Sequence, residues 1–177
     1  MDAVTLLREQ LSAAHQFLEG TMADVTAEQA HWTPPGVATP LGASYAHLVA
    51  SEDMIVNGML KQAPPLAAGS WAGKTGLSEP MPMLGPEWEQ YGAWARRVRV
   101  DLPTLRAYAQ AVYANTDAYV AALAPEDLDR QLDLSNLDIG LVNLAWVLSN
   151  FVVGHVHDIM GEISCLKGLQ GAKGYPF

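Results

Sequence analysis

The sequence is poor in cysteine and in basic residues. Cys165 is the single cysteine among 177 residues, so an intramolecular disulfide, a zinc ribbon and a CxxC pair are all excluded. One cysteine also fits a reducing cytosol better than a secreted scaffold. Ten Lys and Arg stand against 19 Asp and Glu, which gives a net charge of −9. Nucleic acids and anionic membrane surfaces attract basic patches, so both are disfavoured as partners.

Long hydrophobic runs are absent as well. No stretch approaches 18 uninterrupted apolar residues, and the N-terminus lacks the basic and apolar regions of a signal peptide. We therefore expect a cytoplasmic protein. Half of the residues are apolar and 16% are charged, a composition that excludes a disordered chain. The length fits one hydrophobic core, so we treat 1–177 as a single domain.

No segment shows the alternating pattern of a β-strand, whereas four long segments show helical spacing. Apolar residues recur at steps of three and four over 2–25, 41–61, 101–123 and 141–168. Thr26 and Gln29 form a capping-box pattern after the first segment, and Asp101 is a suitable N-cap for the third. The pattern predicts an all-α protein with a four-helix bundle as its core.

The predicted connections differ in length. The segment 62–86 is rich in Pro and Gly and is long for a loop in a compact domain, which predicts a binding loop or lid. Trp71 and Trp88 border it and are candidates to stack on a ligand. We expect a short helix over 87–97 and a loop over 135–140.

Histidines interrupt two of the stripes that should face the core. His47 lies in the second predicted helix and His155 in the fourth. Side chains on facing helices build the metal sites of helical bundles, and neutral imidazole is the commonest metal ligand. The competing interpretation is two unrelated core histidines, each hydrogen-bonded to a neighbour. Ser44 and Ser51 share the His47 face and are expected to line the same pocket.

A third metal ligand is not obvious from the helical spacing. Ile159, four residues after His155, shares its face but cannot bind a metal ion. Asp158 lies about 60° from His155 around the helix and could bend toward it, whereas His157 points roughly 160° away. Glu162 lies about two turns along, too far to bind the same ion. We expect its carboxylate to pair with a polar group of the first helix, and the alternative is that it orients a ligand residue.

Three further polar residues are predicted to be less important. We expect His15 to be a half-exposed helical residue, with the alternative that it lines the mouth of a cavity, and His31 to lie on the surface. Cys165 is expected to be a small buried hydrophobic residue, because nothing near it in sequence would lower the pKa of a thiol.

Several segments together resemble the DinB superfamily, also called the DinB/YfiT-like metalloenzymes. The resemblance covers nearly the whole chain, and its most specific part is the C-terminal region, as in one bacterial subgroup of the family. It implies a four-helix bundle of up-down-down-up type, a long loop between the second and third helices, and a homodimer. The matching segments are Trp32-Thr33-Pro34, Ala46-His47-Leu48, Gly161-Glu162-Ile163, 166–171 and 174–177.

The resemblance also implies a site for a divalent metal ion, zinc or nickel, held by three histidines. His47 matches the histidine of the second helix, and His155 matches the first of two in the fourth helix. Ile159 stands at the position of the third histidine. Three outcomes stay open: the metal is lost, Asp158 or His157 replaces the missing ligand, or water or substrate completes a weaker two-histidine site.

Characterised members of the family include thiol S-transferases and a thiol-dependent isomerase. The resemblance thus implies a metal-dependent enzyme that transfers a low-molecular-weight bacterial thiol to an electrophilic small molecule, with the 62–86 loop shaping the electrophile pocket. The alternative is a metal-free small-molecule-binding bundle, or a structural or dimerisation module, with a degenerate metal site.

Overall fold

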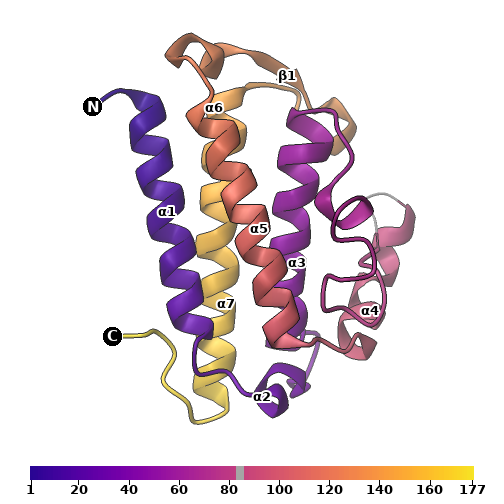
Figure 1. The fold of residues 1–177 in the computed structure, drawn as a ribbon. Helices are drawn as coiled ribbons and strands as arrows, with labels where there is room; N and C mark the ends of the chain where they lie inside the picture. The colour runs from indigo at the N-terminus through magenta and orange to yellow at the C-terminus, as the bar shows by residue number, and fades with distance from the viewer. Residues whose placement is uncertain (83–85) are drawn as a thin grey trace.

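The computed structural model describes residues 1–82 and 86–177. Four long helices lie side by side (Figure 1), and each packs against two of the others, in the cyclic order α1, α5, α3, α7. The prediction of an all-α class is confirmed for most of the chain. The helices are α1 (Ala3–Met22), α3 (Leu41–Asp53), α5 (Leu102–Ala121) and α7 (His155–Leu169).

Two of these helices are continued by wider helical turns. The segment η1 (Met54–Leu60) extends α3, and η6 (Leu148–Gly154) joins the short helix α6 (Leu144–Val147) to α7. Their backbone hydrogen bonds reach five residues back, which is the π-helical pattern. The amide of Lys61, for example, donates to the carbonyl oxygen of Val56. The helical stretches 41–60 and 144–169 therefore match the second and fourth predicted segments closely.

A small antiparallel hairpin is the element that sequence analysis missed. Strands β1 (Gln131–Asp133) and β2 (Leu141–Asn143) pair, with Leu132 opposite Val142. A short 3₁₀ turn, η5 (Ser135–Leu137), connects them. Strands of three residues are too short for alternation to be visible in a sequence. The fourth helical stretch consequently begins at Leu144 rather than at residue 141, and the predicted loop 135–140 is the turn of the hairpin.

The predicted caps are confirmed. At α2 (Ala27–His31), Thr26 Oγ1 accepts from the amide of Gln29, and the Gln29 side chain accepts from the amide of Thr26. The carboxylate of Asp101 accepts from the amide of Thr104 at the start of α5. Helix α2 packs closely on α3, because a Cβ added to Gly42 would lie only 2.8 Å from the carbonyl oxygen of Ala30.

The long connection between η1 and α5 lies beside α3 (Figure 1). It contains η2 (Leu66–Ala68), η3 (Pro86–Gln90) and α4 (Tyr91–Arg97), so the short helix expected over 87–97 is present in two parts. The backbone amides of residues 66 and 67 donate to the carboxylate of Asp53 on α3, which anchors the start of the connection. After α5, the 3₁₀ turn η4 (Pro125–Asp129) leads into the hairpin.

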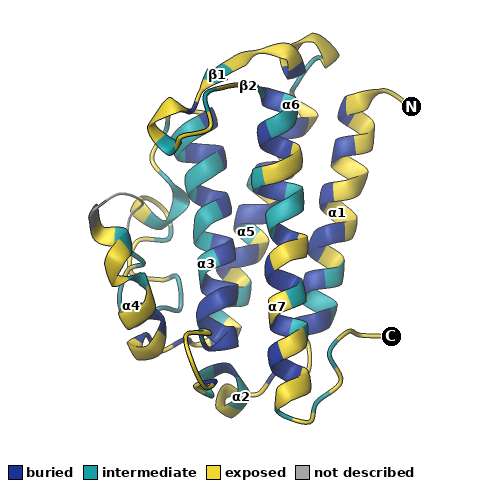
Figure 2. Ribbon diagram, turned by 180° about the vertical axis from the view of Figure 1, so that it is seen from behind, coloured by how far each residue is buried: buried dark blue, intermediate teal, exposed yellow. Residues whose placement is uncertain are grey.

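Buried residues lie on the faces that the four helices turn toward one another (Figure 2). The stripe predicted for the first helix is confirmed, since Leu7, Leu11 and Leu18 are all buried. Burial of such side chains stabilises a fold by roughly 25 cal/mol per Å² of apolar surface removed from water. The largest fully buried side chains include Trp94, Tyr45, Tyr108, Leu18, Leu48 and Leu105.

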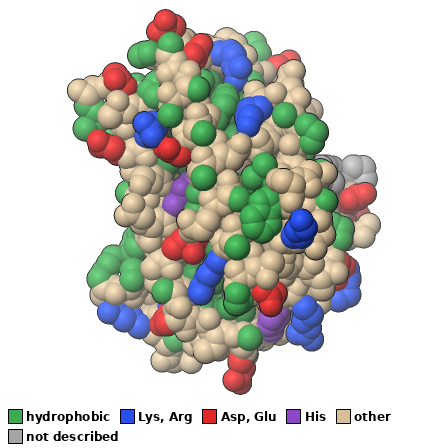
Figure 3. Space-filling view, viewed as in Figure 1, with side chains coloured by type: hydrophobic (Ala, Val, Ile, Leu, Met, Phe, Trp, Pro, Cys, Tyr) green, Lys and Arg blue, Asp and Glu red, His purple; other side chains and the backbone are tan. Residues whose placement is uncertain are grey.

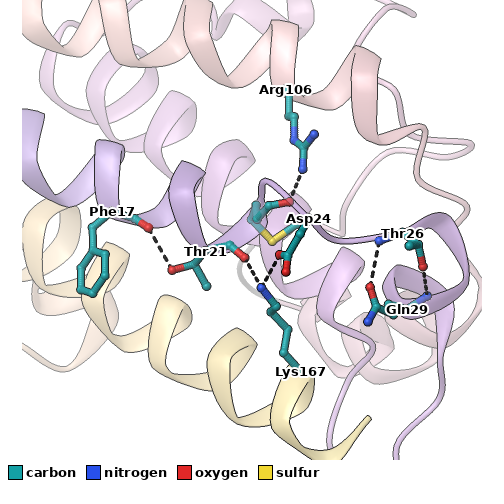
Figure 4. Close-up of polar contacts among 8 residues, drawn as sticks. Phe17, Thr21, Asp24, Thr26, Gln29, Arg106 and Lys167 are labelled. Carbon is teal, nitrogen blue, oxygen red and sulfur yellow. Dashed lines mark hydrogen bonds and ion pairs between the residues drawn. The ribbon is translucent and has the colours of Figure 1, made fainter. Parts of the chain in front are cut away.

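Two basic side chains from other helices hold the C-terminal end of α1 (Figure 4). Lys167 of α7, which is 2% exposed, donates to the carbonyl oxygen of Thr21 at 2.6 Å and to Asp24 Oδ1 at 2.5 Å. Arg106 of α5 donates to the carbonyl oxygen of Met22. Cations are favourable at a helix C-terminus, because the last carbonyl groups carry partial negative charge. These contacts fix α1 against both neighbours.

The outer surface is mixed in charge. On the face drawn in Figure 3, acidic and basic side chains are interspersed and no continuous basic area is visible. Within the described ranges of the chain, the structure has no helix long and apolar enough to cross a membrane.

Candidate functional site

The packing of α3 against α7 brings His47 and His155 together. Their ring centroids lie 5.0 Å apart with an interplanar angle of 79°. His47 lies in the middle of α3, and His155 is the first residue of α7, directly after the wider turns of η6. Both side chains are half-buried. The two histidines singled out in the sequence therefore form one pair.

Burial keeps both imidazoles neutral at pH 7. It lowers the pKa of His47 to about 4, with a smaller contribution from the charge of His155. Burial also lowers the pKa of His155, although the carboxylates of Asp158 and Glu52 oppose that shift. A neutral imidazole has one nitrogen that donates a hydrogen bond and one with a free lone pair, so the pair offers both functions.

The histidine pair has few polar partners. Nδ1 of His47 lies 3.4 Å from the sulfur of Met81 and 3.3 Å from Oγ of Ser51, which are weak contacts. Over the described ranges 1–82 and 86–177, no hydrogen bond to Nε2 of His47 or to either ring nitrogen of His155 is present. The rings of Trp88 and Tyr91 lie 5.6 and 5.3 Å from the His47 ring. Nitrogen atoms of both histidines are thus available to a ligand.

A cavity of about 700 Å³ opens beside this pair. His47, Ser51, His155 and Asp158 line its polar end, so these four predicted residues meet at one place. The rest of its wall is largely apolar and comes from η1, the long connection, the turn of the hairpin, α6 and η6. These residues include Met54, Ile55, Met59, Trp88, Trp146 and Phe151.

A second cavity, of about 540 Å³, also reaches His47. It is lined by Tyr91, Ile159, Glu162 and Cys165 among others. Burial, followed by the charge of Asp158, raises the pKa of Glu162. Glu162 therefore lines the second cavity and not the larger one.

The remaining predicted residues lie outside the larger cavity. His157 is exposed on α7 and lines neither cavity, as its helical position predicts. Ser44 lines neither of them and instead shares a 3.0 Å hydrogen bond with Thr39. Ile159 is buried at the position where a third imidazole would be needed.

These side chains do not fit a three-histidine metal site. Among residues 1–82 and 86–177, no group of three or more His, Cys, Asp or Glu side chains could hold a metal ion. Catalytic zinc sites use three protein ligands and keep a fourth position open. Here the third position is filled by the aliphatic side chain of Ile159.

The comparison with known proteins identifies the family. The model of the DinB superfamily matches residues 10–163. The chain belongs to the DinB superfamily. One solved structure similar to this DinB-superfamily chain is a conserved protein from Enterococcus faecalis, with a TM-score of 0.79 and 22% sequence identity, covering 97% of this chain and 99% of that one. At this identity the likeness supports the fold alone. No curated protein sequence gives a significant match.

Two expectations for polar residues of this DinB-superfamily chain were wrong. His15 is buried rather than half-exposed, because its ring pairs with Glu52 across the core. His31 keeps part of its surface in solvent, and its ring joins the carbonyl oxygen of Ala27 to the amide of Val100. Cys165 is exposed rather than buried. It lies three residues after the exposed Glu162 on α7, so the two share one face.

The sequence did contain a signal for the buried carboxylate. Glu52 and Asp53 are adjacent acidic residues inside a mostly apolar segment. Glu52 follows the apolar residues Leu48 and Val49 by four and three positions, so it shares their face, and a buried carboxylate with a partner could have been expected.

Proposed function

We propose that this protein binds a small, mainly apolar molecule in the cavity beside His47 and His155, and that binding needs no metal ion. The observation that carries the proposal is a cavity of about 700 Å³ whose apolar wall ends at two neutral imidazoles. Small-molecule sites have this size, and they combine an apolar lining with a few polar groups that orient the ligand. The cytoplasm of a bacterium is the proposed location.

The two ends of the cavity have different roles in this proposal. Methionine and aromatic side chains such as Met59, Trp146 and Phe151 supply apolar contact area. The free nitrogen atoms of His47 and His155 supply one or two hydrogen bonds to a hydroxyl, carbonyl or thiol group. The proposal includes an up-down-down-up bundle, which is supported by the cyclic packing order and by the long connection between η1 and α5.

Fluorescence of the neutral probe N-phenyl-1-naphthylamine tests the binding proposal. We expect the wild type to bind the probe with enhanced fluorescence, with the same affinity in the presence of EDTA. Ser51→Trp places a large ring in the cavity and should abolish this binding. Ala13→Trp, on the exposed face of α1, is the matched control and should bind normally. The proposal would be contradicted if the wild type did not enhance the fluorescence of the probe, or if Ser51→Trp and Ala13→Trp bound the probe with equal affinity.

Metal-dependent thiol transfer is the second candidate function, and the pairing of His47 with His155 favours it. In this candidate the two imidazoles would hold zinc or nickel, and water or substrate would complete the coordination, because Asp158 does not form a three-ligand group with them among the described residues. The ion would stabilise a bound thiolate from a low-molecular-weight bacterial thiol. The protein ligands fall short of three histidines, so we derive no reaction step through the ion. A homodimer belongs to both candidates, with an expected mass in sedimentation of twice 19.0 kDa.

Elemental analysis of tag-free protein separates the two candidates. We expect little zinc or nickel in the wild type and in His47→Ala. Ile159→His restores a third imidazole four residues after His155 and should take up close to one zinc ion per chain. Gly168→His adds an imidazole to an exposed, open position of the same helix and should not. Stoichiometric metal in the wild type that disappears in His47→Ala would favour thiol transfer instead.

A further inference from the structure

A groove between α1 and α5 lies on the opposite side of the helices from the His47 cavity. It has a volume of about 710 Å³ and is lined only by side chains of these two helices. In the cyclic packing order, α1 and α5 are adjacent, and α3 and α7 form the other adjacent pair. The groove is thus separate from the cavity assigned above, because the two share no lining residue.

A histidine held in a fixed orientation forms the floor of this groove. His15 is 8% exposed, and its Nε2 lies 2.9 Å from Oε2 of Glu52, which is 1% exposed. The other oxygen of Glu52 accepts from Oγ1 of Thr116 at 2.6 Å. The His15 ring also stacks on Tyr113, with centroids 3.9 Å apart. Because a carboxylate oxygen accepts hydrogen bonds, Nε2 of His15 is the donor in this contact, and Nδ1 is the ring nitrogen left for another partner.

The second nitrogen of His15 is free toward the groove. No hydrogen bond to Nδ1 is formed by the part of the chain that the structure describes. Arg106 Nε is the one fully buried side-chain nitrogen or oxygen without a partner among those residues, so Nδ1 of His15 keeps contact with solvent. A nine-tenths buried imidazole therefore presents an unused lone pair to an open groove.

The charges around this lone pair favour a cation. Arg8 is committed to Asp117 through two hydrogen bonds of 2.9 Å, so this pair is neutral overall. Glu9 and Glu19 also line the groove. Among the described residues of the lining, no second basic side chain faces these two glutamates. The groove is therefore net negative.

Glu19 is arranged to accept one more hydrogen bond. Its Oε1 accepts from the hydroxyls of Tyr45 at 2.7 Å and Tyr113 at 3.0 Å. Tyr113 is the residue on which His15 stacks, so Glu19 and His15 are held by a common neighbour. Oε2 of Glu19 has no partner among the described residues, which leaves an anionic acceptor beside the imidazole acceptor.

We propose that this groove is a binding site for a small organic ammonium ion, whose N–H groups donate to Nδ1 of His15 and to the carboxylate of Glu19. An ammonium group has three donors and no acceptor, which matches two acceptors four residues apart on α1 and a net negative lining. The aliphatic part of the ion lies along the groove between α1 and α5. This site does not depend on the ligand or metal of the His47 cavity.

Titration with three probes of one length tests the charge requirement. Butylammonium, butan-1-ol and butyrate are added separately to isotopically labelled protein at pH 8, and the ring signals of all histidines are followed by NMR. Butylammonium should shift the His15 signals in a saturable manner, and the other two probes should not. Equal shifts with butan-1-ol or butyrate would overturn the proposal. An unresponsive His15 would overturn it too, including the case in which a second copy of the chain covers the groove.

Variants then test the two acceptors. Glu19→Gln keeps an oxygen for the two tyrosine hydroxyls but removes the charge, and it should weaken butylammonium binding about tenfold, as expected for loss of a charge-assisted hydrogen bond. His15→Gln should weaken binding by a similar factor. His157→Gln, on the exposed face of α7, is the matched control and should bind as the wild type does. Unchanged affinity in Glu19→Gln would overturn the proposal even if His15→Gln failed to fold.

The tautomer of His15 provides a readout that does not use the probe. Long-range ¹⁵N–¹H correlation spectra should show the proton on Nε2 and an unprotonated Nδ1 at pH 8. A doubly protonated His15 ring would have no lone pair for an ammonium ion and would overturn the proposal.

Discussion

Two neighbouring regions of α3 hold their polar groups in opposite ways. Asp53 is fully buried, and its carboxylate accepts four hydrogen bonds of 2.5–2.9 Å. The donors are the side chains of Asn57 and Tyr108 and the backbone amides of Leu66 and Ala67. Every lone pair that points into the core is therefore used, and no atom of this cluster remains for a ligand.

His47, less than two turns earlier on the same helix, is the contrasting case. Its hydrogen-bond contacts are with Ser51 and Met81, at 3.3 and 3.4 Å, and it faces open cavities on two sides. The difference teaches that a polar residue inside a helical core is not by itself a site. A fully bonded group fixes the fold, whereas a partly bonded group beside a cavity is free to bind something else.

The comparison predicts its largest effect at Asp53. Asp53→Ala leaves two backbone amides, a tyrosine hydroxyl and an amide side chain without their acceptor. We expect the free energy of unfolding to fall by about 3–5 kcal/mol, measured by urea denaturation. Asp129→Asn, an exposed position, is the control and should change it by less than about 0.5 kcal/mol. If Asp53→Ala lowered the free energy of unfolding no more than Asp129→Asn does, the distinction between the two regions would be wrong.

The pH dependence of stability gives the next largest effect. The pKa of His47 is about 4 in the folded state, below its ordinary value of 6.5, so the unfolded chain binds the proton first. Stability should therefore be complete above pH 6.5 and should decrease as the pH falls toward 4. The loss attributable to His47 is about 3 kcal/mol once the pH lies below 4, because a pKa difference of one unit corresponds to about 1.4 kcal/mol. Urea denaturation curves of the wild type and of His47→Gln at several pH values measure this difference. If both proteins lost the same stability between pH 6.5 and 4, His47 would not be the cause.

The smallest effect is expected when His47 itself is removed. His47→Leu replaces a weakly bonded imidazole with an apolar side chain, and the free energy of unfolding at pH 7 should change by less than about 1 kcal/mol. Tyr108→Phe removes one hydroxyl from the fully bonded cluster and should cost more, about 1–2 kcal/mol. If urea denaturation showed a larger loss of stability for His47→Leu than for Tyr108→Phe, the histidine would stabilise the fold rather than be available to a ligand.

The helices of this protein could largely be predicted from its sequence. Apolar spacing located the four long helices. Thr26 marked the start of the short helix α2 and Asp101 the start of α5, because caps and stripes depend on residues close in sequence. The same reasoning paired His47 with His155, since both interrupt a stripe that must face the core. The hairpin over 131–143 was missed, because three-residue strands leave no periodic signal.

Contacts between distant residues could not be predicted in this way. His15 and Glu52 are 37 residues apart, and only the packing of α1 against α3 shows that they meet. The i→i+5 turns of η1 and η6 were also not predictable, because the helical wheel assumes about 3.6 residues per turn throughout. The exposure of Cys165 likewise follows from the rotation of α7 against its neighbours.

The wider turns have a consequence for the exchange of backbone amide hydrogens with deuterium. Hydrogen bonds in the i→i+5 pattern are interruptions of regular helix, and such segments open locally more readily than their surroundings. Met54 and Met59 of η1 and Asn150 and Phe151 of η6 line the same cavity. Deuterium should therefore enter both segments early in the unliganded protein. A molecule held between them should slow that exchange in both at once, so that two stretches almost a hundred residues apart in the chain respond together.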